Sequence, residues 1–248
     1  LKGTLDMVRR KSPEWAAFVQ QRPADVHMVL TNDHGPCANF KERGVGAGGV
    51  NPHDWIDDEV RGATLIMNEG SKLHGCYRPE RDLTIPTSAV IGERTGGCSA
   101  GSSVGRDHLV FMAGKVSHKL RARIEALHGD DEDFFGMRGP RLDPDEYACA
   151  LQRSIFCLAP RGQAAWSPRF DEAIHAGCIP VVLADGYDPP FHRVLNYSYF
   201  TVRLPEHVVH DGNLKTALTA ISPGRRAELQ RNVRRARAAF RHSDPFAN

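Results

Sequence analysis

Four polar residues in the segment 155–191 have the types and the order expected of a nucleotide-binding site. Arg161 follows an apolar run, and Ser167, Arg169 and Glu172 come after a short loop. A cation and a helix N-terminus both bind phosphate, and a nearby carboxylate accepts hydrogen bonds from ribose hydroxyls. This set of side chains therefore suits a nucleotide.

A β-loop-α-β unit is expected to position these residues. The apolar runs 155–159 and 179–183 are short enough for buried strands. Between them, Ser167 as N-cap and Pro168 in the first turn mark the start of a helix, and Gly177 marks its end. Such a crossover joins parallel strands, and ligands of parallel α/β sheets bind beyond the carboxyl ends of the strands. The sequence therefore predicts an α/β fold with a ligand site at these strand ends.

A second basic pair follows an earlier predicted strand. Residues 108–113 are expected to form that strand, and a helix is expected over 117–127. Lys115 and Arg121 lie at or near the strand end and the helix start, where they could reach a phosphate. The alternative is that both are solvated basic residues, and position alone leaves the two interpretations open.

The size and charge of the chain limit what it can be. It has 248 residues and a formal net charge of +2. This length suits one large domain or two small ones, and the charge does not mark the whole molecule as a polyanion binder. No stretch approaches the roughly 20 apolar residues of a membrane span. The chain begins at Leu1 without Met, so we expect a fragment, and the lack of a targeting segment says little.

A glycine- and serine-rich stretch, residues 95–105, separates two halves of the chain. Its composition is typical of a flexible linker and predicts domains at 1–100 and 101–248. The same stretch contains Gly-Cys-Ser-Ala-Gly around Ser99, a formal match to the nucleophile elbow of hydrolases. That elbow needs a helix after it, and the residues that follow form helices poorly. The hydrolase interpretation therefore lacks its structural context.

The cysteines and one sequon indicate the compartment. None of the six cysteines forms a CxxC pair, so zinc is not expected. Cys157 and Cys178 lie in or beside neighbouring strands and could form a disulfide or remain two buried thiols. A disulfide would imply an oxidising compartment. Asn196 begins an N-glycosylation sequon, Asn-Tyr-Ser, which favours the same conclusion.

Two further segments carry alternative functions. Asp33 and His34 follow a predicted strand at 26–30 and could form a site edge, although Asn, Asp and Gly also build ordinary turns. The helix predicted at 225–241 carries seven arginines and could bind nucleic acid or anionic lipid. Its Leu229 and Val233 instead fit a core stripe beneath a solvated face.

The densest motif resembles that of the exostosin-like glycosyltransferases, the family of heparan sulfate polymerases and of many plant and algal cell-wall transferases. The matching residues are Phe156 to Gly162, Ser167, Arg169, Phe170, Glu172 to Ile174, Ala176 to Val181, Asp185, Tyr187, Pro190 and Phe191. Weaker similarity covers 33–37, where the order of His and Asp is changed, and also 76–86 and 108–121. The resemblance spans nearly the whole chain and is dense in its second half.

The resemblance implies a GT-B fold, in which two Rossmann-like domains face a cleft and the C-terminal one holds the donor. A first domain of 1–100 would be short, so part of it is expected to lie upstream. The implied reaction is inverting transfer of a sugar from a nucleoside diphosphate sugar, most commonly a UDP-sugar, to a hydroxyl of a glycan or glycoprotein. The alternative is a catalytically silent nucleotide-sugar-binding partner of such an enzyme.

The resemblance also assigns roles to residues. Arg161, with Lys115 and Arg121, would bind the diphosphate, Ser167 and Arg169 the phosphate or the sugar, and Glu172 the ribose. Asp33 or His34 would be the general base that an inverting reaction needs. No metal or cofactor is expected, because fixed donors can stabilise the leaving diphosphate. The implied setting is the Golgi lumen, in a type II membrane protein whose anchor lies outside this chain. Nucleic acid is not expected as a partner, and assembly with itself or another chain stays open.

Overall fold

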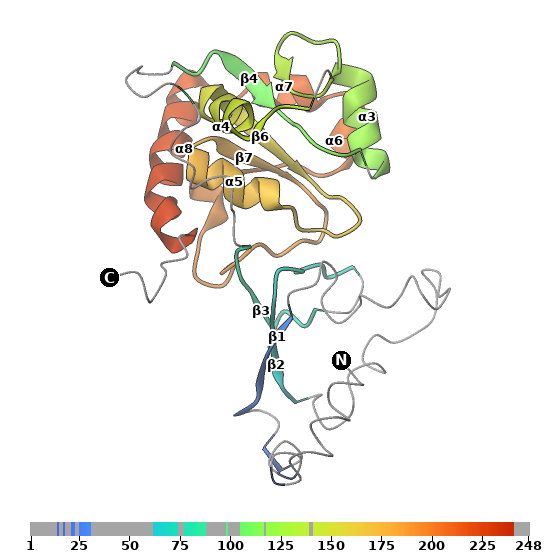
Figure 1. Ribbon diagram of the computed structural model, residues 1–248, viewed down its shortest axis with the longest axis vertical. Helices are drawn as coiled ribbons and strands as arrows, with labels where there is room; N and C mark the ends of the chain where they lie inside the picture. Colours follow the sequence, from blue (N-terminus) through green and yellow to red (C-terminus); the bar gives the residue numbers. More distant parts are fainter. Residues whose placement is uncertain are drawn as a thin grey trace. The chain divides into compact units, whose positions relative to one another are not determined.

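The computed structural model describes residues 14, 17, 21–22, 25–30, 62–73, 77–87, 98, 105–116, 118–138 and 141–240. These belong to two compact units (Figure 1). The first comprises Leu1–Ile85 with Gly186–His192, and the second comprises Pro86–Asp185 with Arg193–Asn248. Among the described residues, no helix combines the length and the apolar character that crossing a bilayer requires.

The second unit is built on a parallel sheet with the order β5-β4-β6-β7-β8. Its strands are β4 (His108–Phe111), β5 (Phe134–Phe135), β6 (Ser154–Pro160), β7 (Ile179–Leu183) and β8 (Val202–Arg203). Every residue of β7 is buried. Strands covered on both faces read as continuous apolar runs, which is why the run at 179–183 could be recognised from sequence.

Helices cover both faces of this sheet (Figure 1). Alternate side chains of the strands enter different clusters, since Val110 and Phe156 belong to one and Phe111 and Cys157 to the other. The first cluster includes residues of α3 (Lys119–His128), α6 (His207–His210), α7 (Leu214–Thr219) and α8 (Pro223–Ala236). The second includes residues of α4 (Pro144–Arg153) and α5 (Pro168–Ala176). Two 3₁₀ turns, η5 (Tyr197–Tyr199) and η6 (Arg237–Phe240), complete the unit. The predicted α/β class is confirmed, whereas the GT-B arrangement stays a prediction.

Two disulfides lie in the second unit. Cys157 of β6 is bonded to Cys178, which directly precedes β7. Sequence left this pair open between a bridge and two thiols. Cys98 is bonded to Cys149 of α4, so a residue of the stretch expected to be a flexible linker is covalently tied to a helix of this unit.

The first unit contains a parallel sheet with the order β1-β2-β3. Its strands are β1 (His27–Leu30), β2 (Thr64–Met67) and β3 (Leu83–Thr84). Gly70 makes room for the segment Gly186–His192, because an added Cβ would lie 2.1 Å from the Asp188 carbonyl oxygen. The Asp188 amide donates to the Gly70 carbonyl at 2.9 Å, and Tyr187 forms an antiparallel bridge with Ser71. A segment distant in sequence is thereby hydrogen-bonded into this unit.

Candidate nucleotide-binding site

A pocket of about 880 Å³ lies at the carboxyl end of the sheet in the second unit. The loops after β4 and β5 and the first turns of α4 and α5 form its walls. Its lining residues are Ala113, Gly114, Lys115, Gly136, Met137, Arg141, Leu142, Asp143, Pro144, Tyr147, Pro168, Arg169 and Glu172. Parallel α/β sheets bind their ligands beyond the carboxyl ends of their strands, which is where this pocket lies.

Arg169 is held against the end of β4. Its Nε donates to the carbonyl oxygen of Ala113 at 2.5 Å, and its Nη1 lies 3.4 Å from Ser167 Oγ. The guanidinium also requires glycine at position 114, because an added Cβ there would lie 1.8 Å from Arg169 Nη2. The φ of Gly114 is +112°, a conformation that other residues rarely adopt. The loop and the arginine therefore fit together as one wall of the pocket.

The start of α5 retains its capacity to bind an anion. Ser167 occupies the N-cap, as the sequence predicts, but its side chain makes no capping bond to the helix backbone. The neighbouring α4 differs, since Asp143 and Glu146 form a complete capping box there. The amides and the positive dipole end of α5 can therefore act on a ligand beside Arg169.

Glu172 and Tyr147 meet across the two helices. Glu172 is 7% exposed, and the Tyr147 hydroxyl donates to its Oε2 at 2.6 Å. Burial, followed by the charge of Glu172, raises the pKa of Tyr147 well above its ordinary value, so the phenol remains a donor at physiological pH. Sequence reasoning missed Tyr147, because a tyrosine at helical spacing is indistinguishable from an ordinary core residue.

The structure separates the predicted phosphate ligands. Lys115, Arg169 and Glu172 line the pocket, and Ser167 contacts Arg169. Arg121 does not line it and instead donates to the carbonyl oxygens of Pro160 and Lys115 at 3.0 and 3.3 Å. Burial, with a smaller effect of Arg169, lowers the pKa of Arg121 to about 10, so its charge persists.

Arg161 is also outside the pocket lining. Its guanidinium faces Glu206, a carboxylate that also accepts from the amide of Asp185 at 3.0 Å. The positive charge at this strand end is therefore partly neutralised within the protein.

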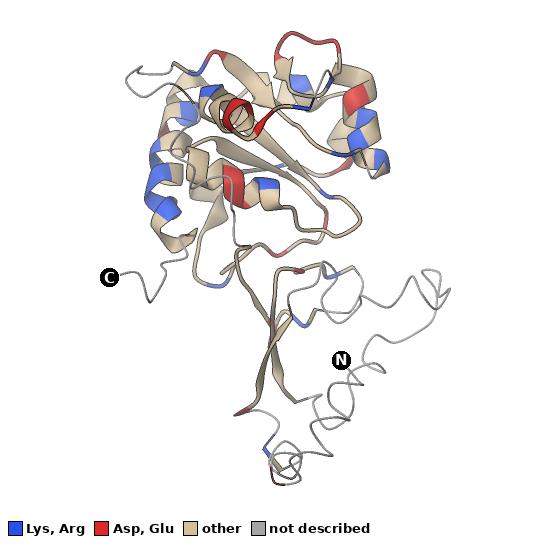
Figure 2. Ribbon diagram, viewed as in Figure 1, with Lys and Arg blue, Asp and Glu red and all other residues tan. Residues whose placement is uncertain are grey.

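Basic residues recur along α8 (Figure 2), and at least two of its arginines make contacts within the protein. Arg226 donates to carbonyl oxygens of Leu218, Thr219 and Ile221 at the end of α7. Arg225 pairs with Glu228 at 2.7 Å. Leu229 and Val233 are buried, as expected of a core stripe.

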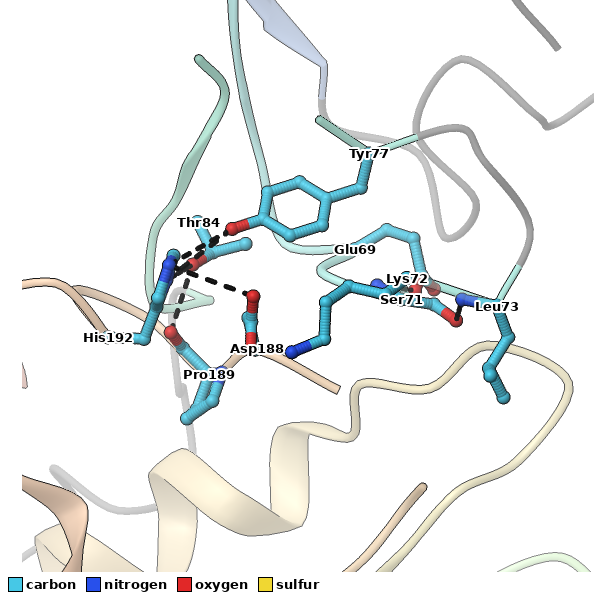
Figure 3. A network of polar contacts seen from close by, with 9 residues as sticks. All are labelled: Glu69, Ser71, Lys72, Leu73, Tyr77, Thr84, Asp188, Pro189 and His192. Atoms are coloured by element: carbon cyan, nitrogen blue, oxygen red, sulfur yellow. Dashed lines mark hydrogen bonds and ion pairs between the residues drawn. The ribbon is translucent and has the colours of Figure 1, made fainter. Parts of the chain in front are cut away.

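A polar cluster surrounds His192 in the first unit, where four side chains point toward one another (Figure 3). Tyr77 Oη lies 3.3 Å from Nε2 of His192, and Asp188 Oδ2 lies 3.7 Å from the same nitrogen. Thr84 donates its hydroxyl proton to the Pro189 carbonyl at 2.9 Å, and its oxygen lies 3.4 Å from Nδ1 of His192. Tyr77 Oη also lies 3.5 Å from Nδ1, so the donor and acceptor roles of the two ring nitrogens depend on the tautomer.

Other predicted residues lie elsewhere. Asp33 and His34 are outside the described residues, as is Ser99 of the hydrolase alternative. Asn196 is exposed, and its Oδ1 accepts from the amide and the hydroxyl of Ser198 at 3.2 and 2.7 Å.

Comparison with known proteins points to one family. A sequence model of the exostosin GT47 domain matches residues 48–221. A probable glycosyltransferase of Arabidopsis thaliana is 29% identical over 99% of this chain and 44% of its own length. A probable glucuronosyltransferase of Oryza sativa subsp. japonica is 30% identical over 85% of the chain and 50% of its own length. The probable beta-1,4-xylosyltransferase IRX10 of Arabidopsis thaliana is 28% identical over 85% of the chain and 51% of its own length. The chain thus spans about half the length of these relatives.

Proposed function

Because the chain belongs to the exostosin GT47 family, we propose that it takes part in glycosyl transfer and binds a nucleoside diphosphate sugar in the pocket of its second unit. One observation carries the proposal. A fixed cation, Arg169, lies beside the uncapped start of α5, and the carboxylate of Glu172 lies one turn further along the same helix. Phosphate is bound by a cation and a helix N-terminus, and ribose hydroxyls donate to a carboxylate.

The proposed chemistry is attack of an acceptor hydroxyl on the anomeric carbon of the donor sugar. A bond forms between the acceptor oxygen and that carbon, the bond to the diphosphate breaks, and a general base takes the proton of the acceptor hydroxyl. The leaving diphosphate gains negative charge, which Arg169, Lys115 and the start of α5 would stabilise. In this proposal protein groups, rather than a metal ion, neutralise the leaving group.

The finer assignments are proposals that follow from the family. They comprise a uridine diphosphate donor, inversion at the anomeric carbon, a GT-B arrangement and a glycan or glycoprotein acceptor. The names of the relatives make UDP-xylose and UDP-glucuronate the first donors to test. Two disulfides fit the oxidising lumen of the Golgi. Asp33 and His34 remain the candidates for the general base that takes the proton of the acceptor hydroxyl.

Nucleotide binding and sugar transfer are measured separately. Titration calorimetry with UDP, GDP and ADP tests the pocket, and we expect UDP to bind. Arg169→Gln should weaken that binding at least about tenfold, because it removes a charged partner of phosphate. Arg153→Gln is the control, since Arg153 pairs with Asp107 and does not line the pocket. Absence of binding by every nucleotide would refute the proposal, whereas binding without transfer would identify the catalytically silent alternative.

A further inference from the structure

Tyr147 holds one of the two oxygens of Glu172. Tyr147 lies in the first turns of α4 and Glu172 in the first turns of α5, so both come from helix ends that open on the pocket. The phenol donates to Oε2 at 2.6 Å. Within the described residues, Oε1 has no hydrogen-bond partner. The carboxylate thus has one oxygen committed to the protein and one able to accept from a ligand.

Packing fixes the position of the phenol. The Tyr147 ring lies edge-on against Phe111 of β4, with ring centroids 5.3 Å apart. The capping box of Asp143 and Glu146 fixes the first turn of α4, and the Tyr147 amide donates to the Asp143 carbonyl at 2.9 Å. The Tyr147 hydroxyl is therefore held in one position. Its hydrogen bond can fix the rotamer of the Glu172 side chain.

We propose that Tyr147 is a positioning residue that orients Glu172 toward a ribose hydroxyl and thereby sets the preference of the pocket for ribonucleotides over deoxyribonucleotides. The inference rests on the proposed nucleotide role of the pocket and adds a determinant of specificity to it. A carboxylate held in place and largely buried loses its ligand partner when the hydroxyl is missing. An unpaired buried acceptor is costly, so a deoxyribonucleotide is rejected more strongly by a fixed carboxylate than by a mobile one.

A structural role alone would leave a different signature. If the bond only ties α4 to α5, its loss changes stability and weakens all nucleotides by a similar factor. If the bond positions Glu172, its loss changes the ratio of the two affinities. That ratio is measured within one variant, so it is insensitive to a general loss of folded protein.

The experiment compares UDP, 2′-deoxy-UDP and 3′-deoxy-UDP by titration calorimetry on the unaltered protein and four variants. The variants are Tyr147→Phe, Glu172→Ala and the double variant. The matched control is Tyr199→Phe, at a residue that is 59% exposed. Phenylalanine at 147 keeps the contact with Phe111 and removes only the hydroxyl. We expect the unaltered protein to prefer UDP over at least one deoxy analogue by about 10- to 100-fold.

In Tyr147→Phe this preference should fall by about three- to tenfold, and in Glu172→Ala it should nearly vanish. Adding Tyr147→Phe to Glu172→Ala should change nothing further, because the phenol acts through the carboxylate. An unchanged preference in Tyr147→Phe, or no preference in the unaltered protein, would overturn the inference while UDP binding still supports the proposed function. Failure of UDP and the other nucleotides to bind would overturn both.

Discussion

The guanidinium of Arg161 and the carboxylate of Glu206 form an ion pair, with Nη1 and Oε1 3.6 Å apart. Their side chains are only 12% and 15% exposed, so solvent screens the pair weakly. Glu206 is also bonded through its own amide to Asp185 at 3.2 Å, which links the pair to the end of β7. Arg161 is therefore engaged by the protein, whereas Arg169 faces the pocket.

This difference predicts unequal effects of two arginine substitutions. Arg161→Gln should weaken UDP binding by less than about threefold, whereas Arg169→Gln should weaken it at least about tenfold. Arg161→Gln should also destabilise the fold, because it leaves Glu206 without its cation. Calorimetry and thermal unfolding of both variants measure the two effects. A larger loss of affinity in Arg161→Gln would restore its assignment to the diphosphate.

Gly114 should be intolerant of a side chain. In Gly114→Ala the new Cβ displaces the Arg169 guanidinium and also strains the backbone at φ +112°. Such strain costs about 1–3 kcal/mol, and UDP affinity should fall about as much as in Arg169→Gln. Gly224→Ala is the control, since a Cβ there meets no atom within 4 Å. If Gly114→Ala kept full affinity, Arg169 would not be the principal phosphate ligand.

Acidification should destabilise the second unit through His128. Burial, chiefly, lowers the pKa of His128 below its ordinary value of 6.5, although Asp131 opposes this. The unfolded chain therefore takes up the proton first, so this stabilisation is complete above pH 6.5 and is lost as the pH falls through the folded-state pKa. The His128 ring stacks on the Phe134 ring, with the ring centroids 4.1 Å apart. Its Nε2 is buried and has no hydrogen-bond partner among the described residues.

The test is urea unfolding at about pH 7.5 and about pH 5.5. His128→Phe keeps the stacked ring and should reduce the loss of stability on acidification. Part of the loss should remain, because the pKa values of His108 and His118 are also lowered, chiefly by burial. His210→Phe, at an exposed position, is the control. An unchanged pH dependence in His128→Phe would exclude His128 as a source.

Asn196 should carry an N-linked glycan when the protein passes through a secretory pathway. The residue is exposed, and its side chain is folded onto the Ser198 hydroxyl of the sequon. Asn196→Asp keeps an oxygen at Oδ1 for these two bonds but cannot be glycosylated. The electrophoretic mobility of Asn196→Asp should match that of the unaltered protein after enzymatic deglycosylation. The melting temperatures of these two samples should also be equal. If enzymatic deglycosylation did not change the mobility of the unaltered protein, Asn196 would not be a glycosylation site.

Local signals account for what could be predicted from sequence. The apolar run at 179–183 became β7 with the same bounds because the strand is buried on both faces. Ser167 and Gly177 were recognisable as helix ends because an N-cap and a left-handed C-cap have strong residue preferences, and the φ of Gly177 is 70°.

Pairings between distant residues could not be predicted in this way. Nothing near Arg161 in sequence indicates Glu206, and nothing near Glu172 indicates Tyr147. Cys98 was hidden in a stretch whose composition is typical of a linker. The segment Gly186–His192 packs into the first unit because Gly70 leaves space for it. The order of residues in the sequence does not indicate this contact.

The two disulfides of the second unit close two covalent rings, one from Cys98 to Cys149 and one from Cys157 to Cys178. Every residue that lines the pocket lies within one ring or the other. A single cut inside either ring would leave its two ends attached, and the loops that meet a ligand would keep their anchorage. Reduction has the opposite effect, because it frees both walls of the pocket at once. The redox state of the surroundings is therefore part of what specifies the shape of this site.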